Sequence, residues 1–465
     1  MAALRGKRAK FSSQLQLRLP AFRRGRPIAV WRRSHRSGSA RSYCPECRHG
    51  ATNQRLVDIA ASAGVTAHSA AIAEDGSLRV AFSDGHASTF APRWLELHSR
   101  SSEPDGSRLR RISSLAECLE AQGGPALPES QRPLPLDAPP RAPWAAIEEG
   151  GPQLAGVLRN FRRQGAVVLE GAATGDDVIE RLAQALGGER ATHYGARFHV
   201  LSKQQPDSLA NTGHALGYHT DLPYRAEVPS VQALHCQQSD AEGGLSLLTD
   251  GFAAAEQLYK DDPMVSGLEP HGEAAVAGPA AAALARRPAQ REGPDRTRSS
   301  RYRGEGHLRA FAELACTPLS FCWQGREGVL LRAQRPVIEL CQNLTLRAVN
   351  FDNRNVRLRL LPESLGGVAG KSLLEAYSAL GARIDAPEKT LKFRLEPGEV
   401  MMFHNRRLLH GRTAFDASSG ARKLHGCYLD MDVIESTERA LELQAEGAMT
   451  RFDAPDFARG SFWDA

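Results

Sequence analysis

The 465-residue sequence predicts a mainly β protein with flanking helices, built around a β-sandwich or barrel. Short apolar segments of strand length follow one another closely after residue 219, and segments with helical spacing flank them. Hydrophobic residues make up 42% of the chain and charged residues 24%, which is typical of a globular protein. The predicted strands span 231–236, 245–249, 319–323, 329–331, 391–396, 400–404 and 423–430.

Residues 1–43 form a basic leader that we expect to be disordered. The first 45 residues contain 12 Lys and Arg and no Asp or Glu, so the remainder, with 47 basic and 53 acidic residues, has a net charge of −6. Such a leader is typical of a mitochondrial transit peptide, and equally of a solvated or mis-started N-terminus. We expect a cytoplasmic protein. If the leader is a transit peptide, the mitochondrion is the alternative. No apolar stretch is long enough to cross a membrane, and neither a membrane nor a nucleic acid is an expected partner.

Three further regions follow the leader. Residues 44–100 read as a small β-rich domain, because Leu78–Phe82 alternate between apolar and polar and Ser83–His86 supply a turn. Residues 101–144 are predicted to be a linker, with seven prolines between 121 and 143. Residues 145–450 then form the main domain. Within it, an Ala-, Gly-, Arg- and Pro-rich stretch at 271–306 has no core periodicity and is predicted to be a disordered insertion.

The main domain begins with helical spacing over 151–163, followed by a buried-strand candidate, Ala166–Leu169. Thr174 is predicted to cap a helix over 176–186, which has acidic residues in its first turn. Further helices are predicted over 371–380 and 435–446.

The strongest chemical signal is a His-x-Asp triplet, His219 and Asp221, at the end of a predicted strand. Residues two apart share one face of a strand, so an imidazole and a carboxylate can converge on one metal. His410 follows another predicted strand, and two His with one carboxylate form the facial triad that holds Fe(II). Arg422 opens the next strand, where a guanidinium can pair with a co-substrate carboxylate.

With these motifs the sequence resembles the γ-butyrobetaine dioxygenase and trimethyllysine dioxygenase family, within the taurine-dioxygenase-like iron/2-oxoglutarate oxygenases. The resemblance covers roughly 44–100 and 145–446, apart from the insertion. It is carried by the motifs His219-Thr-Asp-Leu-Pro-Tyr224, Gln232-Ala-Leu-His-Cys236, Gly243-Gly-Leu-Ser246, Asp250-Gly-Phe252, Leu408-Leu-His-Gly-Arg412 and Gly426-Cys-Tyr-Leu-Asp430.

The resemblance implies a double-stranded β-helix (jelly-roll) catalytic domain in which His219, Asp221 and His410 bind Fe(II). Arg422 would bind the distal carboxylate of 2-oxoglutarate. Oxidative decarboxylation with O₂ would give succinate and CO₂ and hydroxylate a C–H bond, with ascorbate as reductant. The implied partner is a small molecule with a quaternary ammonium group, and a homodimer is an open expectation.

The family's N-terminal domain binds structural zinc through three Cys and one His. Cys44 and Cys47 match two of these Cys, and His86 matches the His. Ser42 stands at the position of the third Cys, so the zinc site departs from the family pattern. Weak zinc binding, recruitment of another ligand such as His35, and inert thiols all remain open.

Family members hold a trimethylammonium group in an aromatic cage. Tyr194 and Tyr428 match two cage positions, whereas Phe198 stands where Trp is usual and Asn211 where Tyr is usual. The matched rings could equally be ordinary packing aromatics. Asn353 loosely matches a position that contacts the substrate carboxylate.

These observations predict an Fe(II)/2-oxoglutarate-dependent dioxygenase that hydroxylates γ-butyrobetaine to L-carnitine. The alternatives within this class are trimethyllysine hydroxylation and a related reaction on another small amine or acid. A non-catalytic binding protein that keeps the fold is an alternative of a different class. A zinc hydrolase is disfavoured, because Arg422 would then have no anionic co-substrate to bind.

Overall fold

The computed structural model describes residues 9–10, 44–52, 54–58, 65–92, 105–128, 131–203, 205–206, 208–261, 308–325, 329–357 and 368–446. The predicted insertion at 271–306 lies outside the described residues, as does the predicted leader apart from Ala9–Lys10. None of the helices in the described part of the chain is long and apolar enough to cross a membrane.

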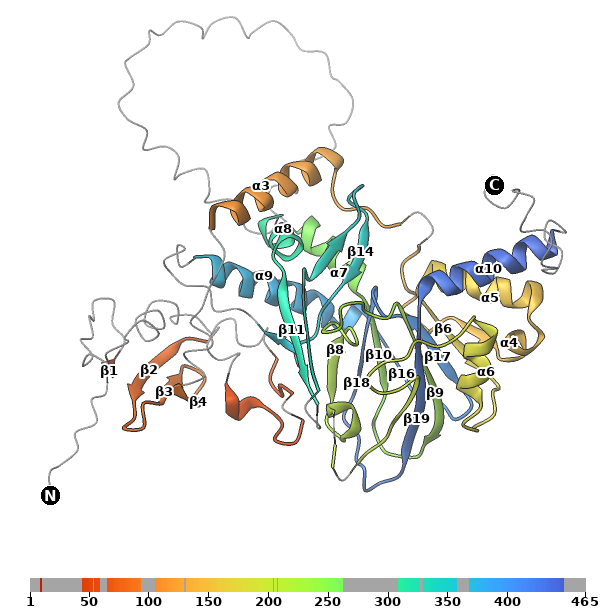
Figure 1. The fold of residues 1–465 in the computed structure, drawn as a ribbon, viewed down its shortest axis with the longest axis horizontal. Helices are drawn as coiled ribbons and strands as arrows, with labels where there is room; N and C mark the ends of the chain where they lie inside the picture. Colours follow the sequence, from red (N-terminus) through yellow and green to blue (C-terminus); the bar gives the residue numbers. More distant parts are fainter. Residues whose placement is uncertain are drawn as a thin grey trace, which may run out of the picture.

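Two β-sheets face each other in the catalytic domain (Figure 1). In sheet order, the larger one comprises β5 (Arg141–Pro143), β6 (Ala166–Glu170), β17 (Val400–His404), β9 (Val231–Ser239), β19 (Arg422–Leu429) and β7 (Arg197–Val200). The smaller one comprises β16 (Thr390–Phe393), β10 (Ser246–Asp250), β18 (Leu408–Arg412) and β8 (Leu216–His219). Buried side chains from both sheets, such as Phe403 of β17 and Leu248 of β10, share one core between them. The predicted mainly β fold is therefore confirmed.

Helices cover the outer face of the larger sheet (Figure 1). They are α4 (Ala145–Glu149), α5 (Gly151–Gln164), α6 (Val178–Ala185) and α10 (Met431–Ala445). The sequence of β17 is apolar throughout because both of its faces are buried. Met401 and Phe403 face the smaller sheet, while Val400 and Met402 face the helices. Helix α6 begins after Asp177 rather than near Thr174, because residues 176–177 form a turn.

A second layer of helices packs on a small antiparallel sheet. The helices are α3 (Asp105–Gln122), α7 (Gly251–Lys260), α8 (Leu308–Cys316) and α9 (Val368–Ile384). The sheet has the order β12 (Leu330–Arg335), β11 (Leu319–Gln324), β15 (Val356–Arg357), and a separate pair joins β13 (Ile338–Leu340) to β14 (Leu346–Val349). Part of the predicted linker is thus helical: α3 precedes most of the prolines and buries Ile112 and Leu119.

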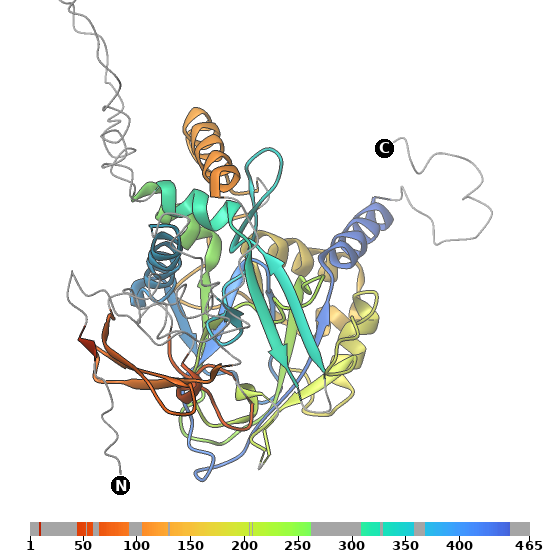
Figure 2. The same ribbon diagram turned by 60° about the vertical axis from the view of Figure 1, so that its left-hand side comes forward.

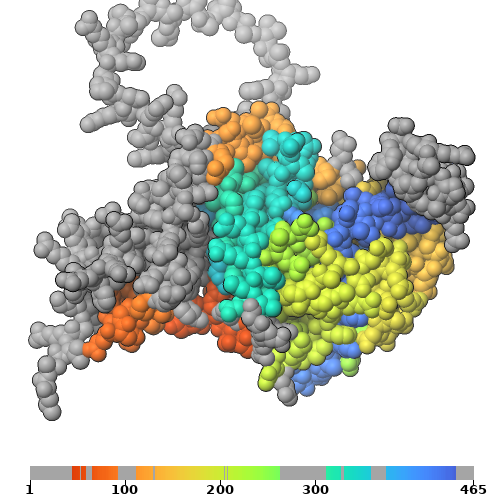
Figure 3. Space-filling view, viewed as in Figure 1, coloured from red at the N-terminus to blue at the C-terminus, as the bar shows by residue number. Residues whose placement is uncertain are grey.

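The N-terminal residues form a separate four-stranded sheet (Figure 2). Its order is β1 (Ala9–Lys10), β2 (Ala67–Ile72), β3 (Leu78–Phe82) and β4 (Ala87–Phe90). The short 3₁₀ turn η2 (Pro45–Cys47) lies between β1 and β2 in the chain. The strand predicted at Leu78–Phe82 is confirmed, with its alternate apolar side chains buried. Figure 3 shows these red and orange residues at the edge of the larger domain.

Candidate active site

The structure brings His219, Asp221 and His410 together. His219 ends β8, and His410 is its direct partner on the neighbouring strand β18. His219 Nε2 lies 3.2 Å from Asp221 Oδ1, and His410 Nε2 lies 3.7 Å from Asp221 Oδ2. One potential ligand atom from each residue lies within 4.8 Å of the others. Strand pairing therefore places side chains about 190 residues apart in the chain around a single point.

The protonation of these side chains suits a divalent cation. The Nδ1 atom of His219 lies 2.9 Å from the Gly217 carbonyl oxygen, and donation of its proton there leaves the Nε2 lone pair available. Burial, followed by the neighbouring His219, lowers the pKa of His410 to about 3. Burial opposes ionisation of Asp221, but His410, His219 and Arg354 together bring the pKa of that carboxyl well below its usual range. Two imidazoles and one carboxylate fit Fe(II) and leave coordination positions open.

The carboxylate ligand is held from several sides. Asn405 accepts a hydrogen bond from the Asp221 backbone N–H at 2.8 Å and donates to its carbonyl at 3.1 Å. The Tyr428 hydroxyl donates to Asp221 Oδ2. Leu222, the next residue, has φ of 60°, a left-handed conformation that is uncommon for a non-glycine residue. The backbone thus turns sharply directly after the ligand.

A cavity of about 560 Å³ opens beside these three side chains. Arg422, at the start of β19, lines it and has no carboxylate partner among the described residues. Burial lowers the pKa of Arg422 to about 10, so the guanidinium remains charged at neutral pH. A buried guanidinium without an acid partner is a ready site for an anionic ligand.

Arg412 also lines the cavity, but it is engaged by the protein backbone. Its guanidinium donates to the carbonyl oxygens of Ala210, Thr212 and His214 at 3.2, 2.6 and 2.8 Å. Arg412 therefore holds the 210–214 segment against β18.

Four aromatic rings line the cavity: Tyr194, Phe198, Tyr224 and Tyr428. The Phe198 ring lies between two of them, with centroids 6.2 Å from Tyr194 and 5.0 Å from Tyr428. Three of the four predicted cage residues are thus neighbouring rings. The fourth predicted residue, Asn211, also lines the cavity. Tyr224 was not predicted from the sequence, although it stands three residues after Asp221 in the motif His219–Tyr224.

Asn353 lies next to the cavity but outside its lining. Its Nδ2 donates to Asp58 Oδ1 at 2.6 Å, and the cavity is lined instead by the two residues that follow, Arg354 and Asn355. No sequence signal distinguished Arg354 from the other 50 arginines, because its exposure to the cavity depends on the path of the 350–356 loop.

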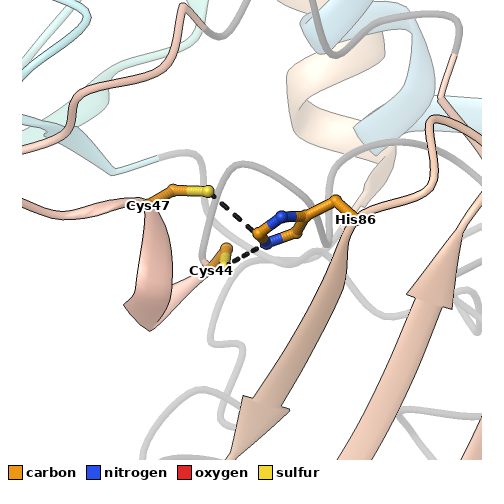
Figure 4. Close-up of side chains that lie close together, drawn as sticks. All are labelled: Cys44, Cys47 and His86. Carbon is orange, nitrogen blue, oxygen red and sulfur yellow. Dashed lines mark hydrogen bonds between the residues drawn. The ribbon is translucent and has the colours of Figure 1, made fainter.

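The N-terminal residues Cys44, Cys47 and His86 also converge (Figure 4). His86 Nε2 lies 3.0 Å from Cys44 Sγ and 3.5 Å from Cys47 Sγ. The Glu46 carboxylate lies 3.1 Å from Cys44 Sγ. Two thiols and an imidazole fit three positions of a tetrahedral zinc site. Ser42 and His35 lie outside the described residues.

The chain is similar to two kinds of curated dioxygenase. It is 29% identical over 402 residues to a γ-butyrobetaine dioxygenase of Pseudomonas sp. (strain AK-1), covering 86% of this chain and 88% of that protein. It is 27% identical over 418 residues to the mitochondrial trimethyllysine dioxygenase of Gallus gallus, covering 90% of this chain and 83% of that one. A solved asparagine oxygenase aligns at 17% identity over 62% of this chain and 82% of that chain, with a TM-score of 0.42, which is too low to support a conclusion.

The family described as taurine catabolism dioxygenase TauD, TfdA family, matches residues 130–267 and 329–428, together more than half of the chain. The first matched segment contains His219 and Asp221, and the second contains His410, Arg422 and Tyr428. The chain therefore belongs to the TauD/TfdA family and is an Fe(II)/2-oxoglutarate-dependent dioxygenase.

Proposed function

We propose that this dioxygenase hydroxylates γ-butyrobetaine to L-carnitine, with succinate and CO₂ as co-products. The observation that carries the proposal is one cavity that combines three features: a two-His-one-carboxylate cluster, the Arg422 guanidinium, which has no acid partner in the described part of the chain, and the rings of Tyr194, Phe198, Tyr224 and Tyr428. Each feature matches one chemical requirement of the reaction, namely iron, an anionic co-substrate and a quaternary ammonium substrate.

His219, Asp221 and His410 would hold Fe(II), which supplies O₂ activation coupled to oxidative decarboxylation of the keto acid. Arg422 would bind the distal carboxylate of 2-oxoglutarate, because a charge-assisted pair in a buried site is strong and directional. Tyr428 would orient the Asp221 carboxylate, and Asn405 would hold the Asp221 backbone. Ascorbate would serve as the reductant that maintains ferrous iron.

The rings favour a trimethylammonium substrate. Such a cation is weakly hydrated and lacks N–H donors, so ring faces and packing supply its affinity. Tyr194, Phe198 and Tyr428 provide neighbouring faces, and Tyr224 adds a ring that partly compensates for Asn211. Trimethyllysine carries the same cation and is the alternative substrate. The two kinds of relative act, by name, on these two compounds.

Two structural proposals accompany this function. The facing sheets support the double-stranded β-helix as the catalytic core of residues 145–450. Cys44, Cys47 and His86 support a structural zinc site in the N-terminal domain. A homodimer and a cytoplasmic or mitochondrial location remain predictions.

The test is succinate formation by the purified protein with Fe(II), 2-oxoglutarate, O₂ and ascorbate. We expect γ-butyrobetaine to stimulate it, with a product 16 Da heavier by mass spectrometry, and trimethyllysine and taurine to stimulate it less. Stimulation by trimethyllysine alone would replace the substrate. No succinate with any compound would favour a binding protein.

Variants of the three metal-binding side chains test the same proposal at the level of the site. His219→Ala, Asp221→Ala and His410→Ala should each abolish turnover in a soluble, folded protein, since losing one of three ligands removes most of the metal affinity. A variant that keeps near-normal activity would remove that residue from the triad.

A further inference from the structure

Arg354 places a further buried guanidinium in the cavity, beside the metal-binding cluster. Its side chain is only 12% exposed, and one terminal nitrogen, Nη2, lies 3.7 Å from Asp221 Oδ1. It stands on the loop between β14 and β15, whereas Arg422 begins β19. Arg197 and Arg412 also line the cavity, but the first pairs with glutamates and the second with backbone carbonyls. Arg354 and Arg422 thus present guanidinium groups from different structural elements, although 2-oxoglutarate needs only one for its distal carboxylate.

The orientation of Arg354 is fixed by Asp352. The fully buried Asp352 carboxylate accepts hydrogen bonds from the Arg354 backbone N–H at 2.9 Å and from its Nε at 3.2 Å. The other Asp352 oxygen accepts from Asn355 Nδ2 at 2.7 Å. Among the described residues, neither terminal nitrogen of Arg354 has a hydrogen-bond acceptor. The Nε is thus used for positioning, and the two Nη atoms remain available to a ligand.

The loop that carries Arg354 is tied to the cluster by Thr220, which stands between two of the metal-binding residues. The Thr220 backbone N–H donates to the Phe351 carbonyl at 2.7 Å, and its hydroxyl donates to the Val349 carbonyl at 2.7 Å. From the other side, Arg55 Nη1 donates to the Asn353 carbonyl at 2.5 Å. These bonds hold the guanidinium at a set place relative to the cluster, as a specificity determinant requires.

We infer that Arg354 binds a carboxylate of the substrate and makes the enzyme selective for zwitterions over plain cations. The inference rests on the proposed hydroxylation and names the substrate group that Arg354 recognises. A guanidinium near the cluster attracts the anionic end of the substrate and repels its trimethylammonium end, which is then directed to the aromatic rings. The carbon presented for hydroxylation should therefore lie within a few bonds of the carboxylate.

A rival role for Arg354 is only to balance the charges of Asp221 and Asp352. The two roles differ in how the enzyme treats a substrate that keeps the cation but lacks the anion, such as 4-trimethylammoniobutyramide. If Arg354 binds the carboxylate, the wild type should show a KM about 10- to 100-fold lower for γ-butyrobetaine than for this amide.

The variants are Arg354→Gln and Arg354→Lys, with Arg347→Gln as a matched control at an exposed arginine of β14. Arg354→Gln should raise the KM for γ-butyrobetaine about 10- to 100-fold and leave those for the amide and 2-oxoglutarate within about twofold. Arg354→Lys keeps the charge and should lie in between, and Arg347→Gln should match the wild type. Equal losses for acid and amide, or a selective loss of 2-oxoglutarate affinity, would overturn the inference.

A binding experiment separates this inference from the proposed function. Butyrate and butyramide are titrated anaerobically into protein saturated with Fe(II) and 2-oxoglutarate, so that Arg422 is occupied. Intrinsic tryptophan fluorescence reports binding, since Trp323, one of the five tryptophans, stacks on the cavity residue Tyr224 with ring centroids 6.0 Å apart. A butyrate preference that Arg354→Gln abolishes supports the inference even if γ-butyrobetaine is not turned over. A preference that the variant retains overturns it even if γ-butyrobetaine is a substrate.

Discussion

The Tyr428 hydroxyl donates a hydrogen bond to Asp221 Oδ2 at 2.9 Å, so a residue expected to recognise substrate also contacts a metal-binding carboxylate. Tyr428→Phe removes this bond and keeps the ring that stacks on Phe198. We predict about a 10-fold loss of metal affinity, measured from the Fe(II) dependence of turnover, with little change in the KM for γ-butyrobetaine. Tyr218→Phe, on β8 but outside the cavity lining, is the control. Unchanged metal affinity with a raised substrate KM would make the hydroxyl a substrate contact instead.

Arg422 and Arg412 should separate into a ligand-binding and a structural arginine. Arg422→Gln should raise the KM for 2-oxoglutarate about 10- to 100-fold, because a buried charge-assisted pair is lost. Arg412→Gln should chiefly lower the midpoint of thermal unfolding, since its bonds to three carbonyls hold residues 210–214. Kinetics and thermal melts on both variants decide the matter; the reverse pattern would exchange the two assignments.

Phe198 should contribute through its ring face. The ring lies over Gly426, where a Cβ would stand 2.9 Å from Phe198 Cζ, so glycine admits it. Phe198→Ala should raise the KM for γ-butyrobetaine about 10-fold, and Phe198→Trp, alone or with Asn211→Tyr, should lower it. The control compound is 5,5-dimethylhexanoate, in which carbon replaces the charged nitrogen. Equal effects on both compounds would show that the ring packs on methyl groups without sensing charge.

A row of histidines should make stability depend on pH. His425 of β19 pairs with His199 of β7 on one side and His235 of β9 on the other. Burial, followed by His199, lowers the pKa of His425 to about 4. In the unfolded chain the His425 imidazole is protonated near pH 6.5, whereas in the folded chain it is protonated only near pH 4. The free energy of unfolding should therefore fall as pH decreases from 6.5 to 4 and lose this dependence above 6.5.

His425→Gln removes one such proton and should reduce the slope by at most about 1.4 kcal/mol per pH unit. Urea unfolding between pH 4 and 7.5 measures it, with His68→Gln, at an exposed histidine of β2, as control. An identical slope in His425→Gln and the wild type would exclude His425 as a source of acid sensitivity.

The sequence predicts residues whose role follows from local spacing. His219 and Asp221 stand two apart at a strand end. His410 was predicted to follow the strand at 400–404, whereas the structure places it within β18, whose pairing with β8 completes the cluster. Arg354 and Tyr224 escape such prediction, because their exposure to the cavity depends on how two loops turn after the metal-binding strand. Asn353 and Arg354 show how far such prediction reaches. They are neighbours on one loop, but the Asn353 side chain binds Asp58, whereas the Arg354 side chain lines the cavity.

The same contrast holds for the fold. Apolar strands such as β17 were predictable because both of their faces are buried. Helix α3 was not, since its apolar residues are sparse and the prolines that follow dominate the composition of the region. Its helical state depends on the surface offered by α8, which the local sequence does not reveal.

The bonds from the N-terminal domain to the 350–356 loop connect two segments about 300 residues apart in the chain, so the specificity inferred for Arg354 depends on both segments. Arg55 binds the carbonyls of Asn353 and Val356, and Gln54 accepts from the Leu209 backbone N–H while itself lining the cavity. In a chimera that joins this N-terminal domain to the catalytic domain of a relative, Gln54 and Arg55 would face a cavity and a loop of different sequence. Such a chimera should therefore have an altered substrate site. Changes of substrate during divergence of such enzymes would accordingly require residues 54–58 and 350–356 to change together.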